Sequence, residues 1–252
     1  MIIRQMLDYA VELGIVDRNV YSSLKIKSRM VFKTERKGPS EEQVFTPEEV
    51  AAITEAAWND FHSGYNTVHK LVPLAVLFQF QTGLRAGELC AVRYEDITGN
   101  KMYVRRMYRY SEHEVVDFTK GNNPGRIVPL TSDALNIIKT AKDYQHDNGL
   151  PEDGYIFSVN KDPFSYYALK KIYEKYSLEI CGIIKSSHKV RKTFISALLD
   201  GGVNLDKVRE IVGHADEKTT LNAYCYDRRD LDENIELMEN ALSDHKKTEN
   251  EQ

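Results

Sequence analysis

Residues 82–89 read Thr-Gly-Leu-Arg-Ala-Gly-Glu-Leu, and this octapeptide separates two helical patterns. A long apolar helix is predicted over Val68–Gln81, and Gly83 breaks it, because glycine readily takes the left-handed conformation in which helices commonly end. Leu84–Arg93 predicts a second, short helix. The stretch therefore places Arg85 at the start of a helix, directly after a sharp turn.

Helical patterns dominate the rest of the chain, with β-rich stretches between them. Lys101–Arg109, Val115–Thr119 and Arg126–Leu130 are rich in strand-forming residues and are separated by polar turns, which predicts a small antiparallel sheet. A capping box at Thr46 and Glu49 predicts another helix start. Further helices are predicted from Ser132 or Asp133 and over Tyr166–Ile180, Lys189–Leu199, Leu205–Val212 and Glu217–Tyr224. We therefore expect a mainly α fold with a small antiparallel β-sheet, in the α+β class.

The composition is that of an ordinary globular protein. The 252 residues are 42% hydrophobic and 29% charged, and no apolar run approaches the length of a membrane span. The first residues carry charge where an export signal needs an apolar core. Cys90, Cys181 and Cys225 are odd in number and far apart, which fits a reducing compartment. We expect a cytoplasmic protein without a membrane partner.

Charge is segregated along the sequence. The net charge of -4 taken alone argues against a nucleic-acid partner. However, Lys25–Lys37 holds six basic residues and one acid, and Lys161–Lys192 holds eight basic residues against three acids. Such runs can form a basic face on an acidic protein, or they can be solvated helix surfaces, and charge alone does not decide between these.

Three groups of residues in the C-terminal third have the chemistry needed to attack a DNA phosphate. His188 stands three residues before Arg191, so both can project from one face of a helical turn. Gly213 precedes His214, and Tyr224 follows ten residues later. A phenol can act as a nucleophile once cations and a base lie close, and a guanidinium presents paired donors to phosphate oxygens. The set therefore offers a nucleophile, cations and proton carriers.

Together with the arginine of residues 82–89, these groups resemble the tyrosine recombinase (phage integrase) family. The resemblance covers roughly Phe45–Arg228 and implies the integrase-type catalytic domain. It implies that Tyr224 is the nucleophile, with Tyr226 as a competitor two residues on. It also implies recombination of double-stranded DNA, through a 3'-phosphotyrosyl link, by four subunits and with no metal ion or other cofactor. Such an enzyme serves a phage or mobile element, or resolves chromosomes.

The resemblance assigns the remaining roles residue by residue. Arg85 and Arg191 would clamp the scissile phosphate, and His214 would donate a hydrogen bond to it. His188 would assist proton transfer from the nucleophile. Lys120, near a turn rich in polar and helix-breaking residues, would protonate the leaving 5' oxygen. Each residue also has a structural reading, as a packed aromatic, a surface cation or a core histidine.

The same resemblance divides the chain into three parts. Residues 1–45 would hold the last helix of an N-terminal DNA-binding module that begins upstream, followed by a basic linker. Residues 46–226 would form the catalytic domain. Residues 227–252 would form an amphipathic helix, which could dock on a neighbouring subunit, and a disordered tail from Ser243. The helix is marked by Leu231, Ile235, Met238 and Leu242.

Three other functions stay open at this point. Lys189–Val212 also resembles a helix-turn-helix, which would make the chain a DNA-binding regulator without catalysis. A type IB topoisomerase would use the same chemistry to relax supercoils as a monomer. A zinc site from His188, His214 and Cys225 lacks the usual ligand spacing.

Overall fold

The computed structural model describes residues 2–22, 40–63, 69–117, 125–152, 154–213 and 235. The chain divides into two compact units, Met1–Gly38 and Pro39–Gln252. In the first unit, the helix expected within residues 1–45 is α1, Ile2–Glu12. The Asn19 side chain donates hydrogen bonds to the Arg4 carbonyl and the Asp8 carboxylate, at 2.9 and 2.7 Å, which ties the following loop to the helix.

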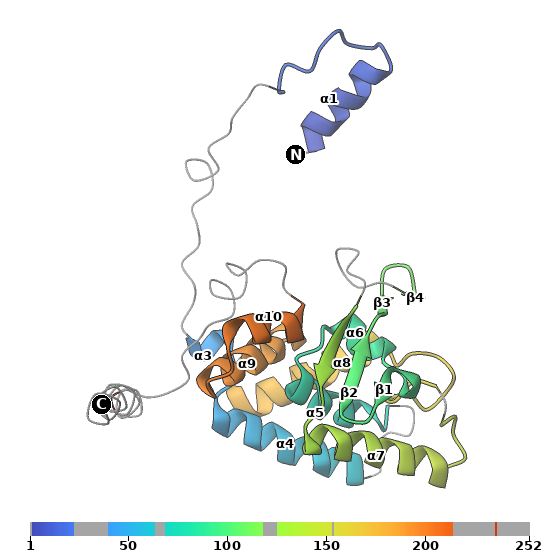
Figure 1. Cartoon of the computed structure of the whole chain (residues 1–252), viewed down its shortest axis with the longest axis vertical. Helices are drawn as coiled ribbons and strands as arrows, with labels where there is room; N and C mark the ends of the chain where they lie inside the picture. The colour runs from blue at the N-terminus through green and yellow to red at the C-terminus, as the bar shows by residue number, and fades with distance from the viewer. Residues whose placement is uncertain are drawn as a thin grey trace, which may run out of the picture. The chain divides into compact units, whose positions relative to one another are not determined.

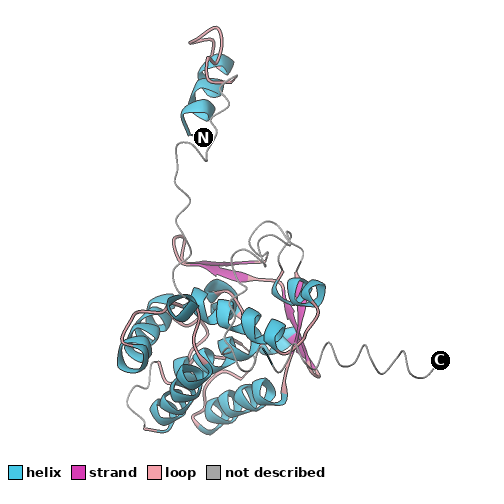
Figure 2. Ribbon diagram, turned by 90° about the vertical axis from the view of Figure 1, so that its left-hand side faces the viewer, coloured by secondary structure: helices cyan, strands magenta, loops and turns pink. Residues whose placement is uncertain are grey.

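Helices make up most of the second unit, and the strands lie at its edge (Figures 1 and 2). After the short helix α3, Ser40–Gln43, the capping box is confirmed at the start of α4, Pro47–His62. Helix α5, Val72–Thr82, is buried along most of its length and packs against α4 and three further helices of this unit. Because α5 is surrounded, it is the element on which the other helices are assembled.

The remaining helices largely follow the sequence pattern. Helix α6 spans Ala86–Ala91, α7 spans Ser132–Asp147, α8 spans Tyr166–Tyr176, α9 spans Ser187–Asp200 and α10 spans Leu205–Val212. The prediction over Tyr166–Ile180 differs in one respect, because a wider π turn, η2 at Ser177–Cys181, continues α8. The predicted helix over Glu217–Tyr224 and the tail from Ser243 lie outside the described residues.

The strands form two antiparallel sheets rather than the single sheet that was predicted. β1 (Ile97–Thr98), β2 (Lys101–Val104) and β5 (Arg126–Pro129) make a three-stranded sheet in the order β1-β2-β5. β3 (Met107–Arg109) pairs with β4 (Glu114–Val116) in a separate hairpin. The prediction of one continuous strand over Lys101–Arg109 is therefore wrong, because β2 and β3 are separate strands.

Two arginines explain where that strand is interrupted. The turn η1, Tyr94–Asp96, lies beside β2 and carries two acids. Arg105 Nε donates to Asp96 Oδ1 at 2.9 Å, and Arg106 Nη2 donates to Glu95 Oε1 at 2.6 Å. Both arginines thus reach the same turn, whereas successive side chains of one strand point to opposite faces. The backbone consequently leaves the β2 register before β3 begins.

Within the part of the chain that the structure describes, no helix is long and apolar enough to cross a membrane.

Candidate active site

The turn before Arg85 requires glycine at position 83. Gly83 closes α5 with a φ of 60°, and its amide donates to the Gln79 carbonyl at 2.8 Å. A Cβ atom at this position would lie 2.3 Å from Phe194 Cδ1, on α9. Only glycine satisfies both the left-handed backbone and the close approach of α9. The chain therefore turns sharply, and Arg85 becomes the first residue before α6, as predicted.

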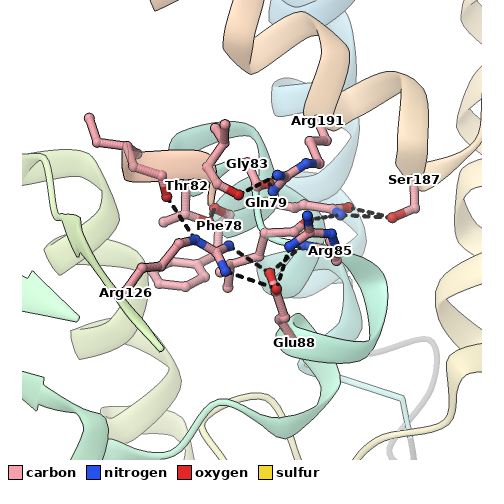
Figure 3. A network of polar contacts seen from close by, with 12 residues as sticks. Phe78, Gln79, Thr82, Gly83, Arg85, Glu88, Arg126, Ser187 and Arg191 are labelled. Carbon is pink, nitrogen blue, oxygen red and sulfur yellow. Dashed lines mark hydrogen bonds and ion pairs between the residues drawn. The ribbon is translucent and has the colours of Figure 1, made fainter. Parts of the chain in front are cut away.

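Glu88 binds two arginines in the interior (Figure 3). Its Oε1 accepts from Arg85 Nη1 at 2.9 Å, and its two oxygens accept from Arg126 Nη1 and Nη2 at 2.9 and 2.7 Å. Burial acts to raise the pKa of Glu88, but the Arg126 hydrogen bonds and the charges of Arg126, Arg191 and Arg85 outweigh it and lower the pKa to about 2. Glu88 is therefore ionised at neutral pH and holds Arg85 and Arg126 together.

Arg191 is buried, with 2% of its surface exposed, so the alternative of an exposed basic helix face is wrong for this residue. Its Nη1 donates to the Gly83 carbonyl at 2.7 Å, and its Nη2 donates to the Val212 carbonyl. Residues 108 positions apart in the sequence meet in the first of these bonds. Arg191 thereby joins the turn before Arg85 to the end of α10.

His188 lies in the first turn of α9 and keeps contact with solvent. Partial desolvation and the positive charges of Lys192, Arg191, Lys189 and Arg85 lower the pKa of His188 to about 4. The ring is therefore neutral at neutral pH and can accept a proton. Because Arg85 and Arg191 both act on it, the predicted trio of His188, Arg85 and Arg191 lies in one region of the molecule.

Arg126 is the residue that sequence reasoning missed. It lies on β5, and its Nε donates to the Ile211 carbonyl at 2.8 Å while its other nitrogens bind Glu88. Together with Arg191 it binds two of the last carbonyls of α10, where the helix dipole favours cations. The only sequence signal was a charge at the start of an otherwise apolar strand, and that signal is weak.

Three lysines, two on α9 and one just before it, bind residues at and before the start of α4. Gln43 Oε1 accepts from Lys189 Nζ at 2.6 Å and from Lys192 Nζ at 3.0 Å. The buried Lys185 donates to Glu49 Oε2 at 2.6 Å and to the Val44 carbonyl at 2.9 Å. The residues that precede α4 are therefore anchored to the helix that carries His188.

An arginine after a tight turn, a buried arginine and a neutral histidine thus lie in one region, in agreement with the motifs that resemble the phage integrase family. Residues 43–229 match the sequence profile of the phage integrase family. The chain belongs to the phage integrase family.

Individual relatives are distant in sequence and similar in fold. The chain is 27% identical to a XerC-like tyrosine recombinase of Caldanaerobacter subterraneus over 89% of this chain and 60% of the recombinase. It is 26% identical to the integrase of Staphylococcus phage L54a over 92% of this chain and 70% of that integrase. This integrase-family chain thus spans about 60% of the length of the first relative.

The fold matches a solved integrase. The Tn1549 transposon integrase in complex with transposon right-end DNA aligns with a TM-score of 0.66 and 16% identity, over 94% of this chain and 76% of that one. At this identity the likeness establishes the fold, which is that of an integrase catalytic domain. The predicted fold class, mainly α with antiparallel β-structure, is confirmed.

Three of the six predicted site residues of this integrase-family chain lie outside the described residues, namely Lys120, His214 and Tyr224. Tyr226 and Cys225 lie outside them as well, so the choice of nucleophile and the zinc alternative stay as predictions. Among the residues that are described, no group of three or more histidine, cysteine, aspartate or glutamate side chains is arranged to hold a metal ion.

Proposed function

We propose that the chain is a site-specific DNA recombinase that cleaves and rejoins strands through a 3'-phosphotyrosyl intermediate. The single observation that carries this proposal is that the segments of Arg85, Arg191 and His188 are bonded together. Arg191 binds the Gly83 carbonyl, and Gln79 binds both the Leu84 carbonyl, next to Arg85, and Ser187, next to His188. Attack on a phosphate requires cations that stabilise its negative charge and a neutral base that assists removal of the nucleophile's proton. The two arginines and the histidine can supply these.

In the proposed reaction the Tyr224 hydroxyl attacks the scissile phosphorus and His188 assists removal of its proton. The bond from phosphorus to the 5' oxygen breaks, and Lys120 gives that oxygen a proton. Arg85 and Arg191 stabilise the negative charge on the phosphate, to which His214 donates a hydrogen bond. The 5' hydroxyl of a partner strand then attacks the phosphotyrosine and releases Tyr224. The ester bond stores the energy for rejoining, so the cycle requires no nucleotide hydrolysis.

The arginines differ in how they support this role. Arg85 keeps 29% of its side chain exposed and can meet a phosphate directly. Arg191 is buried and contributes charge while it holds the Gly83 and Val212 carbonyls. Gly213 is the last described residue before His214. It lies against Arg126, since a Cβ atom on Gly213 would be 2.9 Å from Arg126 Cδ. This supports the assignment of His214 to the same site.

The proposed partner is double-stranded DNA in the cytoplasm, with four subunits acting on two duplexes through a four-way junction. In this proposal residues 1–45 belong to a DNA-binding module and linker, 46–226 to the catalytic domain and 227–252 to a docking helix and tail. Deleting the chain from Leu231 onward tests the docking. We expect loss of the higher assembly on DNA by native gel, with cleavage retained; unchanged assembly would remove the docking role.

The decisive experiment is covalent capture on a nicked suicide DNA substrate. We expect a protein–DNA adduct that Tyr224→Phe abolishes and the matched Tyr226→Phe retains, with the joined residue identified by mass spectrometry. Capture that survives Tyr224→Phe would move the nucleophile elsewhere. DNA binding without capture would favour the regulator, and relaxation of supercoiled DNA by an isolated monomer would favour the topoisomerase.

A further inference from the structure

Gln79 is a fully buried amide in the middle of the apolar helix α5. Its Nε2 donates to the Leu84 carbonyl at 2.6 Å and lies 2.7 Å from Ser187 Oγ. Its Oε1 accepts from the Tyr173 hydroxyl, and Ser187 Oγ lies 3.1 Å from the same oxygen. The amide therefore bonds the turn that follows α5 and two segments that are distant in the sequence, as Figure 3 shows for Ser187.

A glutamine at this position is costly unless its bonds serve a purpose. The seven residues before it, from Val72 to Phe78, are buried and apolar, so a leucine or methionine would suit the packing. Burying an amide is unfavourable unless every polar atom finds a partner. Here each polar atom of the side chain is hydrogen-bonded, so specific partners compensate the burial of the amide.

The segments that Gln79 joins are those that carry the site. Leu84 directly precedes Arg85, and Ser187 directly precedes His188. Arg191 binds the Gly83 carbonyl, so the two successive carbonyls of the turn, at positions 83 and 84, are held by Arg191 and Gln79. The turn that positions Arg85 is thus held at one carbonyl by a side chain of α9 and at the next carbonyl by a side chain of α5.

We propose that Gln79 is a positioning residue for strand cleavage, which fixes Arg85 relative to His188 through the Leu84 carbonyl and the Ser187 hydroxyl. This inference rests on the proposed function. Gln79 does not touch the phosphate; it acts through the two residues whose placement it sets. Displacement of a reacting group by about 1 Å can cost roughly a hundredfold in rate, so a tie of this kind has a measurable effect.

Gln145 provides a matched control for a purely structural role. It is also a fully buried glutamine, on α7. Its Nε2 donates to the Tyr155, Ile156 and Ser158 carbonyls at 3.1, 3.3 and 2.7 Å, and its Oε1 accepts from the Tyr94 hydroxyl at 2.7 Å. None of these partners is a candidate site residue.

The test compares Gln79→Met with Gln145→Met in the full chain, because methionine keeps the volume and removes the hydrogen bonds. Single-turnover capture on nicked DNA gives the cleavage rate, fluorescence anisotropy gives the DNA affinity, and urea unfolding reports the fold. We expect Gln79→Met to slow capture by roughly tenfold to a hundredfold with affinity unchanged within about twofold. Ser187→Ala, which removes one of the two ties, should give an intermediate loss.

Gln145→Met should capture DNA at close to the wild-type rate, even if its urea unfolding midpoint falls by as much as that of Gln79→Met. Equal loss of capture in the two variants, or wild-type capture by a folded Gln79→Met, overturns the positioning role. NMR titration of the His188 ring provides a readout that needs no DNA, and its midpoint should rise in Gln79→Met. If the wild-type protein captures no DNA, the proposed function fails, and an unchanged His188 midpoint would then refute the positioning separately.

Discussion

Two arginine clusters in this protein differ in how their charge is balanced. The site cluster combines one buried carboxylate with three arginines, and it comprises Arg85, Glu88, Arg126 and Arg191. The hairpin cluster lies between η1 and the β3–β4 hairpin, and it comprises Arg93, Glu95, Asp96, Arg105, Arg106 and Asp117. The two clusters use the same cation in opposite ways.

In the hairpin cluster, carboxylates neutralise the arginines. Glu95 lies within ion-pair distance of Arg93, Arg105 and Arg106, at 3.9, 3.2 and 2.6 Å, and Asp96 adds a second acid. In the site cluster Arg85 and Arg126 share Glu88, while Arg191 donates hydrogen bonds to two backbone carbonyls. Among the residues that the structure describes, positive charge therefore predominates in the site cluster. The two clusters therefore differ in their balance of charge and not in their number of arginines.

The largest expected effect separates the clusters by activity. Arg85→Ala should lower covalent capture by about a hundredfold to a thousandfold, because it removes a preorganised donor from the developing charge. The matched substitution Arg105→Ala removes a neutralised cation and should change capture by no more than about threefold. Single-turnover capture with both variants checks this. Equal losses would show that the hairpin cluster also serves the reaction.

The next effect concerns stability. Glu88→Gln should destabilise the fold by about 3 kcal/mol, because it leaves buried arginines without their anion. The matched change Glu95→Gln, at an exposed carboxylate, should have little effect on urea unfolding. The difference should also depend on pH. The pKa of Glu88 is lowered to about 2, so its contribution is present above about pH 4.5 and is lost as the pH falls toward 2. A pH-independent difference would contradict this.

A smaller effect distinguishes two glycine turns, one at Gly83 before Arg85 and one at Gly99 between Asp96 and Arg105. Gly83 and Gly99 have φ values of 60° and 58°, but only at Gly83 would a Cβ meet a neighbour, since none lies within 4 Å at Gly99. Gly99→Ala should cost about 1 kcal/mol through backbone strain alone. Gly83→Ala should cost about 2 kcal/mol or more, because Phe194 must move, and it should slow capture. Similar unfolding midpoints for the two variants would refute the packing argument.

The smallest effect is a titration. Desolvation and neighbouring cations lower the pKa of His188 to about 4, whereas a hydrogen bond that its ring donates to the Glu152 carboxylate raises the pKa of the exposed His146. NMR should therefore resolve two rings that titrate on opposite sides of the usual value. Between about pH 6.5 and 4 the unfolded chain binds the His188 proton more readily, so stability falls as the pH falls. A titration midpoint of His188 at the usual value would indicate that the neighbouring cations lie farther from its ring than in the structure.

The sequence predicted what depends on local signals. The capping box at Thr46 and Glu49, the break at Gly83 and the helices α5 and α10 each follow from residues a few positions apart. The proximity of Arg85, Arg191 and His188 came from resemblance to a family, and the structure brings those three together. Lys120, His214 and Tyr224 stay as predictions.

Long-range side-chain bonds were beyond prediction. Arg126 and Glu88 are 38 positions apart, and Gln79 and Ser187 are 108 positions apart, so no periodic pattern connects them. The burial of Arg191 and the division of the expected strand at Arg105 and Arg106 have the same origin, because both depend on partners supplied by other elements.

The bond from Arg191 to the Gly83 carbonyl has a consequence for biosynthesis. The ribosome releases α5 and α6 long before α9, and chains fold as they emerge. Until position 191 has left the exit tunnel, the turn at Gly83 lacks its partner, and closing a loop of this length costs entropy that only the finished contact offsets. A nascent chain therefore cannot complete the contacts around Arg85, Glu88 and Arg191 before α9 has left the exit tunnel.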